Sequence, residues 1–233
     1  MTTHPQDAGE TARALLADSD AVLVDLDGTL LDSQVAVRTV CGVFARRHGL
    51  SEDDVYSFVY GRLPREAIPV LLPDGDHAAE VAAFDEAELR QAEAGGIEAL
   101  PGAHELLADR RRPLALVTSC SHALATARLR AAGLIAPGAM VTADSVRHGK
   151  PDPECFLLGA RMLGVDPARC VVFEDSPAGI LAGRAAGARV IALRTTRSDA
   201  ELQDADVIVD TLASALPASR AAATDPNTVL RAA

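Results

Sequence analysis

The chain has 233 residues, 48% hydrophobic and 24% charged, which is enough for one globular core carrying a smaller inserted domain. Its formal net charge of −11 disfavours non-specific binding to nucleic acid or anionic membrane, and small molecules are the expected ligands. The four cysteines show no C-x-x-C spacing, which favours reduced thiols. Because no signal peptide or long apolar run is recognisable, we expect a cytoplasmic protein. We also expect it to be a monomer or a homodimer.

The first half of the chain predicts one buried strand and then a helical insertion. Residues 1–19 are expected to be an N-terminal extension with a short helix over 8–17. A strand follows at Ala21–Val24, and the next comes only at Leu114–Val117, far beyond the ~30 residues of a complete βαβ unit. Residues 34–98 are helical in pattern, with stops at Gly49 and Gly95. We therefore predict a helical cap domain over residues 34–98.

The second half alternates between strand and helix patterns. A short helix is expected over 103–112, and further short apolar runs predict the strands Met140–Val141, Val171–Phe173, Val190–Leu193 and Val207–Val209. This order predicts an α/β fold, with a Rossmann-like parallel sheet built from residues 20–33 and 99–216 and helices on both faces. Residues 217–233 lack periodicity and are expected to form a flexible tail.

Asp25 and Asp27 directly follow the first strand, and Gly28 allows the chain to turn there. Ligands of parallel sheets bind beyond the carboxyl ends of the strands, so both carboxylates should face a ligand. An alkyl phosphate leaves as a poor alkoxide and needs an acid on the leaving oxygen. We interpret Asp25 as a nucleophile that forms an aspartyl-phosphate, and Asp27 as the acid and then the base. Aspartate pairs of this spacing also cap turns or bind calcium.

Two later groups stand at comparable positions. Thr118 and Ser119 end the second strand, where hydroxyl and N–H groups can hold a phosphoryl oxygen, although such residues also cap helices. Lys150, between Gly149 and Pro151, can neutralise the phosphoryl group and Asp25, although most lysines are solvated. The joint placement of these groups at successive strand ends favours a phosphoryl site.

The carboxylates at this edge of the sheet would repel a phosphate dianion, so the site requires a cation. Asp175 follows the fourth strand and, with the carboxylate of Asp25 and the carbonyl oxygen of Asp27, offers hard oxygen ligands to Mg²⁺. Glu174 can be a direct ligand, a more distant supporting group or a neighbour of the helix cap. The predicted cofactor is therefore Mg²⁺, held by Asp25, Asp27 and Asp175.

The motifs Asp25–Thr29, Val117–Ser119, Gly149–Pro153 and Phe173–Ile180 together resemble the haloacid dehalogenase superfamily, over most of residues 20–210. The likeness is greatest to its sugar and polyol phosphatases, which carry a helical cap between the first and second motifs. The resemblance implies the same roles for the matching residues: Asp25 as nucleophile, Asp27 as acid and base, Thr118, Ser119 and Lys150 for phosphate, and Asp175 for Mg²⁺.

Other activities within the resemblance remain as alternatives. The patterns of dehalogenases, phosphonatases and P-type ATPases lack an aspartate at the position of Asp27, which favours phosphate esters. A β-phosphoglucomutase shares all four motifs, but the histidine that opens its cap corresponds to Val37. A non-catalytic phospho-sensing protein is a third hypothesis, against which the complete aspartate pair and the cap both count.

The cap is expected to determine the substrate. Arg62, with Arg65 nearby, lies between two predicted cap helices where the family's substrate loop falls, and we predict that Arg62 contacts the leaving group. A solvated arginine at a helix end is the alternative interpretation.

Overall fold

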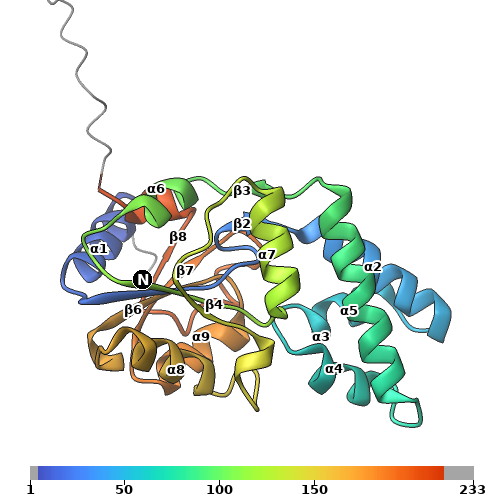
Figure 1. The fold of residues 1–233 in the computed structure, drawn as a ribbon. Coiled ribbons are helices and arrows are strands. Elements are labelled where there is room, and N and C mark those ends of the chain that lie inside the picture. The colour runs from blue at the N-terminus through green and yellow to red at the C-terminus, as the bar shows by residue number, and fades with distance from the viewer. Residues whose placement is uncertain (1–4, 218–233) are drawn as a thin grey trace, which may run out of the picture.

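A computed structural model describes residues 5–217, in which six parallel strands form one sheet in the order β5-β4-β1-β6-β7-β8 (Figure 1). The strands are β1 (Ala21–Val24), β4 (Leu114–Val117), β5 (Ala139–Val141), β6 (Cys170–Glu174), β7 (Arg189–Leu193) and β8 (Val207–Val209). The first strand, β1, is central, with Val22 paired to Leu114 of β4 and to Val171 of β6. The predicted α/β fold with a parallel sheet is confirmed.

Both faces of the sheet are apolar because its strands are buried on two sides. In β1, Val22 and Val24 belong to one hydrophobic cluster, and Ala21 and Leu23 belong to another, as the two-residue period of a strand requires. The first cluster packs under α1 (Pro5–Ala17), α6 (Ala103–Ala108), α7 (His122–Ala131) and α10 (Leu212–Ala215). The second packs under α8 (Glu154–Leu163) and α9 (Pro177–Ala185).

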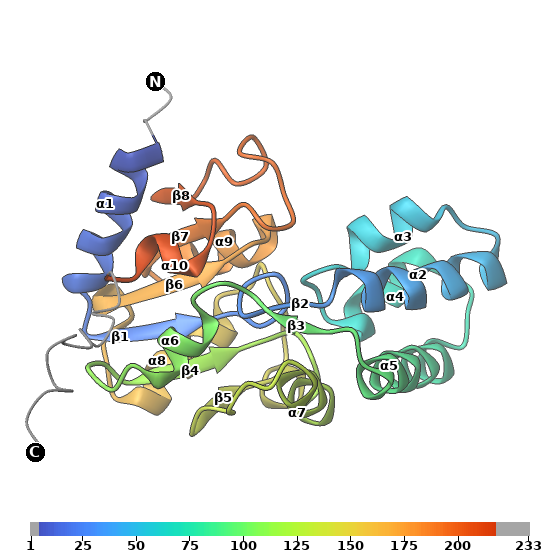
Figure 2. The same cartoon turned by 90° about the horizontal axis from the view of Figure 1, so that it is seen from above.

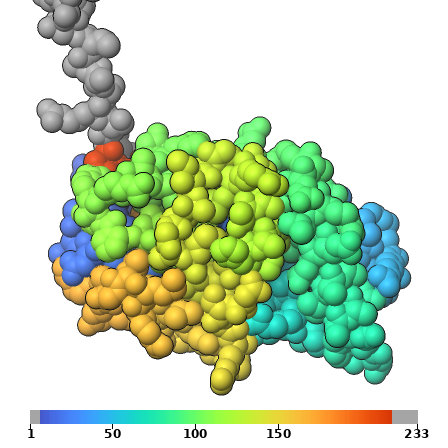
Figure 3. Space-filling view, viewed as in Figure 1, coloured from blue at the N-terminus to red at the C-terminus, as the bar shows by residue number. Residues whose placement is uncertain are grey.

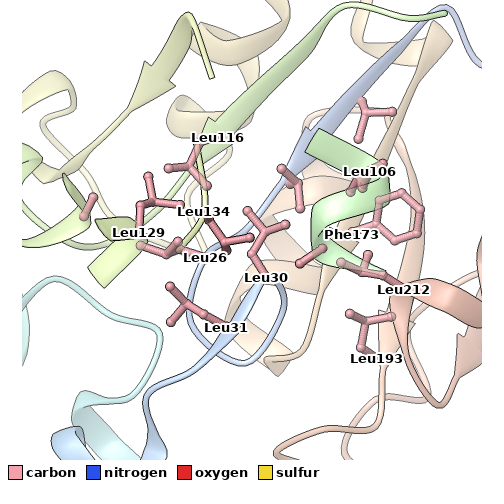
Figure 4. Packing of buried hydrophobic residues seen from close by; sticks show 14 of the residues in the cluster. Leu26, Leu30, Leu31, Leu106, Leu116, Leu129, Leu134, Phe173, Leu193 and Leu212 are labelled. Atoms are coloured by element: carbon pink, nitrogen blue, oxygen red, sulfur yellow. The ribbon is translucent and has the colours of Figure 1, made fainter. Parts of the chain in front are cut away.

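Figure 4 shows where the first cluster meets the loop that follows β1. Leu26, Leu30 and Leu31 are fully buried within this cluster. Backbone N–H groups of Leu30 and Leu31 donate to the Leu26 carbonyl, which curls the loop tightly after the strand. The apolar residues of the loop are thus anchored in the core, and the polar residues on either side of Leu26, Asp25 and Asp27, are held at the carboxyl edge.

Four helices are inserted between β1 and β4: α2 (Gln34–His48), α3 (Glu52–Val59), α4 (Pro64–Leu71) and α5 (His77–Ala94). We refer to these helices and their loops, residues 34–94, as the helical insert. The insert packs around a hydrophobic cluster of its own that includes Phe44, Ile68 and Phe84. It lies to one side of the sheet and is joined to it through a short antiparallel pair, β2 (Leu31–Asp32) with β3 (Glu98–Ala99) (Figure 2).

Two short 3-10 helices, η1 (Ala143–Ser145) and η2 (Pro167–Arg169), complete the elements of the described chain. The helix predicted over 103–112 ends earlier than expected, at Ala108. Asp109 leaves the helical conformation, and its carboxylate accepts a hydrogen bond from the Arg111 backbone N–H, a side-chain turn that competes with the helix.

The short helix expected over residues 8–17 begins earlier, at Pro5. The predicted flexible tail falls almost entirely on residues 218–233, outside the described residues. Within residues 5–217, every helix is too short or too polar to cross a membrane.

Candidate functional site

Several of the predicted site residues meet at the carboxyl edge of the sheet. Asp25 follows β1, Thr118 follows β4 and Asp175 follows β6, and these three strands are direct neighbours. All three side chains are buried. Lys150 reaches them from the loop between η1 and α8 and is only 3% exposed.

Lys150 is held by carboxylates and is not a solvated surface group. Its ammonium lies 2.6 Å from Asp25 Oδ1 and 2.5 Å from Glu174 Oε1, and it donates to the Val117 carbonyl at 3.3 Å. Burial alone lowers the pKa of Lys150, but the charges of Asp25 and Glu174 outweigh it and the net change is upward. Lys150 therefore carries its positive charge beside Asp25 at neutral pH.

Asp25 and Asp175 lie in a buried, strongly acidic environment. Burial raises the pKa of Asp25 to about 7, against the opposing charge of Lys150. Burial, followed by the charges of Glu174 and Asp25, raises the pKa of Asp175 well above its ordinary value. Asp25, Glu174 and Asp175 each place a carboxylate oxygen within 4.8 Å of the others. One ammonium does not balance three carboxylates, so a further cation would stabilise their charged forms.

The donor set fits Mg²⁺, which prefers carboxylate and carbonyl oxygen ligands. Glu174 is the least suitable of the three carboxylates, because its Oε1 contacts Lys150 and its Oε2 accepts from the backbone N–H groups of Asp175 and Ser176. The Tyr60 hydroxyl, buried beside Asp175, finds no hydrogen-bond partner among residues 5–217, which fits a place for a water molecule or an ion.

Gly28 makes the close approach of these groups possible. Its φ of +79° is in the left-handed region, and a Cβ at this position would lie 2.1 Å from Asp175 Oδ2 and 2.6 Å from the Tyr60 hydroxyl. A side chain at residue 28 would thus strain the backbone and occupy the space where Asp175 and Tyr60 meet.

Asp27 is held by residues that the sequence did not single out. Its Oδ1 accepts from the Ser33 hydroxyl at 2.6 Å, and its Oδ2 lies 2.8 Å from Arg128 Nη1 and 3.0 Å from Cys120 Sγ. Arg128, on α7, is 2% exposed and also contacts Glu88 Oε1 at 2.8 Å. Glu88 belongs to α5 of the helical insert, so Arg128 connects Asp27 to the insert.

A small cavity of about 40 Å³ lies between the sheet edge and the helical insert. Asp25, Asp27 and Asp175 line it from the core, and Val37, Tyr60 and Arg62 line it from the insert. Arg62 stacks over the Phe58 ring at 4.5 Å and donates to the Phe58 carbonyl at 3.2 Å. The predicted substrate residue therefore reaches the same cavity as the aspartates.

The hydroxyl residues after β4 differ in their contacts. Thr118 is buried, and its hydroxyl accepts a hydrogen bond from the Cys120 backbone N–H. Ser119 donates to the carbonyl of Gly61 in the insert at 3.0 Å. Both residues line the cavity, and Ser119 also joins the core to the insert.

The sequence has clear relatives among proteins of known function. It is 42% identical over 196 residues to hexitol phosphatase A of Escherichia coli (strain K12), covering 82% of this chain and 90% of that protein. It is 38% identical over 204 residues to validoxylamine A 7'-phosphate phosphatase of Streptomyces hygroscopicus subsp. limoneus, covering 82% of this chain and 92% of the relative.

The fold is shared with solved structures as well. CbbY from Rhodobacter sphaeroides, solved in complex with phosphate, superposes with a TM-score of 0.73 at 27% identity, over 84% of this chain and 95% of that one. The family model of haloacid dehalogenase-like hydrolases matches residues 19–187. This match covers the sheet edge, the buried acidic site and the helical insert together, and the resemblance inferred from the motifs is confirmed. The chain belongs to the haloacid dehalogenase-like hydrolase family.

Proposed function

We propose that this protein is a Mg²⁺-dependent phosphatase that hydrolyses a small sugar or polyol phosphate through an aspartyl-phosphate on Asp25. The observation that carries the proposal is the convergence of Asp25, Asp27, Lys150 and Asp175 on one buried edge beneath the helical insert. The two relatives described above are phosphatases, and the chain is accordingly a phosphoric monoester hydrolase.

In the first step, an Asp25 carboxylate oxygen attacks phosphorus, and the bond from phosphorus to the leaving oxygen breaks. Lys150 donates to Oδ1 of Asp25, which orients the carboxylate and leaves Oδ2 for the attack. Asp27 gives its proton to the leaving oxygen, so the sugar or polyol departs as a neutral alcohol. The Thr118 hydroxyl, which accepts from the Cys120 N–H, can donate to a phosphoryl oxygen, and Ser119 and Lys150 do so when they exchange the Gly61 and Val117 carbonyls for it.

In the second step, water attacks phosphorus and Asp27 takes up one of its protons. The phosphorus–oxygen bond to Asp25 breaks, which restores the Asp25 carboxylate and releases inorganic phosphate. The proton that Asp27 gives up in the first step is thus returned to it in the second. The carboxylates of Asp25 and Asp175 and the carbonyl oxygen of Asp27 would hold Mg²⁺, which would supply positive charge to the phosphoryl oxygens. Glu174 serves the site by holding Lys150.

The helical insert is the proposed cap domain, with its limits near residues 34 and 98. It covers the catalytic edge and presents Arg62 to the leaving group. Hydroxyl-rich leaving groups fit the polar lining that Arg62 provides, and the relative hexitol phosphatase A is named for a hydroxyl-rich alcohol of this kind. Val37 lines the cavity where an acid or base would serve a mutase, and its side chain cannot transfer protons, which favours hydrolysis.

The experiment that tests the proposal is a phosphate-release screen of ~50 phosphorylated metabolites, with Mg²⁺ and with excess chelator. We expect Mg²⁺-dependent release from a few sugar or polyol monophosphates. Conversion of β-glucose 1-phosphate to glucose 6-phosphate with a bisphosphate primer, without net release, would instead indicate a mutase. No release across the panel would contradict the proposal and favour a phospho-sensing protein.

A further inference from the structure

A buried chain of charges runs from the catalytic edge into the helical insert. Arg128 Nη1 lies 2.8 Å from Asp27 Oδ2, and Arg128 Nη2 lies 2.8 Å from Glu88 Oε1. The side chains of Arg128 and Glu88 are both less than one tenth exposed. One guanidinium thus bridges the proposed acid of the reaction and a carboxylate of the insert, and each end of the bridge uses a different nitrogen atom.

The two partners of Arg128 belong to different parts of the molecule. Arg128 lies on α7 of the core and Glu88 on α5 of the insert, and the two helices pack side by side (Figures 1 and 2). On the face seen in Figure 3, the green surface of α5 meets the yellow-green surface of α7. Another contact across this boundary, from Arg65 to the carbonyls of Ala143 and Val146, is exposed and does not reach a catalytic side chain.

The size of the cavity requires the insert to move during turnover. At about 40 Å³ the cavity is far below the ~300–1,000 Å³ of ordinary small-molecule sites, and a sugar phosphate cannot enter it as it stands. Separation of the insert from the core would take Glu88 away from Arg128. The arrangement described here, with the Arg128–Glu88 contact made, is therefore the closed one.

Formation of the contact between Arg128 and Glu88 affects Asp27 directly. The Asp27 carboxylate is fixed at Oδ1 by Ser33 and at Oδ2 by Arg128. The planar guanidinium of Arg128 has a fixed angle between its nitrogens, so a carboxylate bound at Nη2 sets the direction in which Nη1 points. With Glu88 absent, Arg128 loses one of its two carboxylate anchors, and the orientation of Asp27 is less defined.

We propose that Glu88 and Arg128 are positioning residues through which closure of the helical insert places Asp27 for proton transfer to the leaving oxygen. This inference rests on the proposed phosphatase function and adds to it a link between substrate enclosure and the acid. Asp27 is fully oriented only when the insert is closed over a substrate, so proton donation is confined to the enclosed complex.

The test compares Glu88→Gln with the wild type on two substrates that differ in their need for an acid. Sorbitol 6-phosphate releases a poor alkoxide and needs the proton from Asp27, whereas p-nitrophenyl phosphate releases a stabilised phenolate and does not. Rapid mixing measures the first turnover, which isolates phosphoryl transfer to Asp25. For Glu88→Gln we expect a ~10- to 100-fold lower rate with sorbitol 6-phosphate, little change in KM, and a p-nitrophenolate burst within ~2-fold of wild type.

Two further variants test whether Glu88 acts through Arg128 and Asp27. Arg128→Lys keeps the charge but offers one nitrogen in place of two, so we expect it to reproduce the substrate-selective loss and to replace Glu88→Gln if that variant fails to fold. In an Asp27→Asn background, Glu88→Gln should cause no additional loss with sorbitol 6-phosphate, because the group it positions is already removed.

Glu80→Gln is the matched control. Glu80 lies on the same helix but contacts Arg47 and His48 within the insert, each at 3.1 Å, and we expect wild-type rates from it on both substrates. Equal losses with both substrates, or wild-type rates for Glu88→Gln and Arg128→Lys, would overturn the inference. Failure of the proposed function has a different signature, because the wild type and the Glu80→Gln control would then be inactive too, and the inference would fall with it.

Discussion

Glu174 Oε1 lies 2.5 Å from the ammonium of Lys150, and both side chains are almost completely buried. The second oxygen of Glu174 is occupied by the Ser176 hydroxyl and two backbone N–H groups, so the carboxylate has a fixed place in the core. Lys150 in turn reaches Asp25. Glu174 thereby determines where the positive charge of the site lies, although it does not line the cavity.

Replacement of Lys150 tests this arrangement through stability. Lys150→Met leaves two buried carboxylates without their cation, and we expect it to lower the free energy of unfolding by about 3–5 kcal/mol. In a Glu174→Gln background the same replacement should cost less, with a coupling of about 1–3 kcal/mol. Urea unfolding of the four proteins measures both values, and strictly additive effects would contradict the ion pair.

Asp25→Asn should abolish activity without unfolding the protein. The amide cannot attack phosphorus, so we expect turnover to fall by about 10⁴-fold or more. Since burial raises the pKa of Asp25, a neutral isostere removes a desolvation cost, and the melting temperature should be unchanged or higher. Phosphate release and circular dichroism check the two expectations, and substantial activity in a folded variant would exclude Asp25 as the nucleophile.

Arg62→Ala tests substrate contact. Loss of the guanidinium from the cavity should raise KM for the best sugar phosphate by about 10-fold with a smaller change in kcat. Arg46→Ala is the control, because Arg46 pairs with Glu52 on the exposed side of the insert. Kinetic constants are measured for each hydrolysed substrate, and unchanged values for Arg62→Ala on all of them would remove this residue from the site.

The raised pKa of Asp85 predicts that the stability of the fold depends on pH. Burial, followed by the charge of Glu88, raises the pKa of Asp85 to about 6 from its ordinary value of 3.8. The folded state therefore holds the proton more tightly than the unfolded chain. This contribution to stability is fully present below pH ~4 and is lost as the pH rises through ~6.

Asp85→Asn removes that dependence. Relative to wild type, the variant should melt about 1–3 °C higher at pH 7.5 and show no gain at pH 4. The exposed Asp74→Asn serves as the control and should show no such difference between the two pH values. Scanning calorimetry at both pH values decides the point, and an equal shift at pH 4 and 7.5 would refute the assignment.

The sheet and the positions of Asp25, Thr118 and Asp175 follow from sequence because buried parallel strands leave short apolar runs, and the polar residue ending each run lies at the ligand edge. The catalytic and metal roles given to these residues stay predictions. So do the cap boundaries, the cytoplasmic location and the oligomeric state.

Arg128 and Glu88 were missed because a charged residue in a helix is usually solvated. A signal was nevertheless present. Glu88 stands four residues from both Phe84 and Ala92, and Arg128 stands four residues from Leu124, so each charge falls on a buried stripe. Tyr60 left no comparable pattern, since its place beside Asp175 depends on how the insert packs on the core.

The central position of β1 in the sheet affects when the protein can fold during its synthesis. Val22 pairs with residues 114 and 171, so the strand that presents Asp25 remains without neighbours until distant segments have been synthesised. Such non-local pairing slows folding and delays it towards the end of translation. Lys150 and Asp175 are also synthesised late. A nascent chain therefore cannot hydrolyse phosphate esters before its helical insert is in place to select among them.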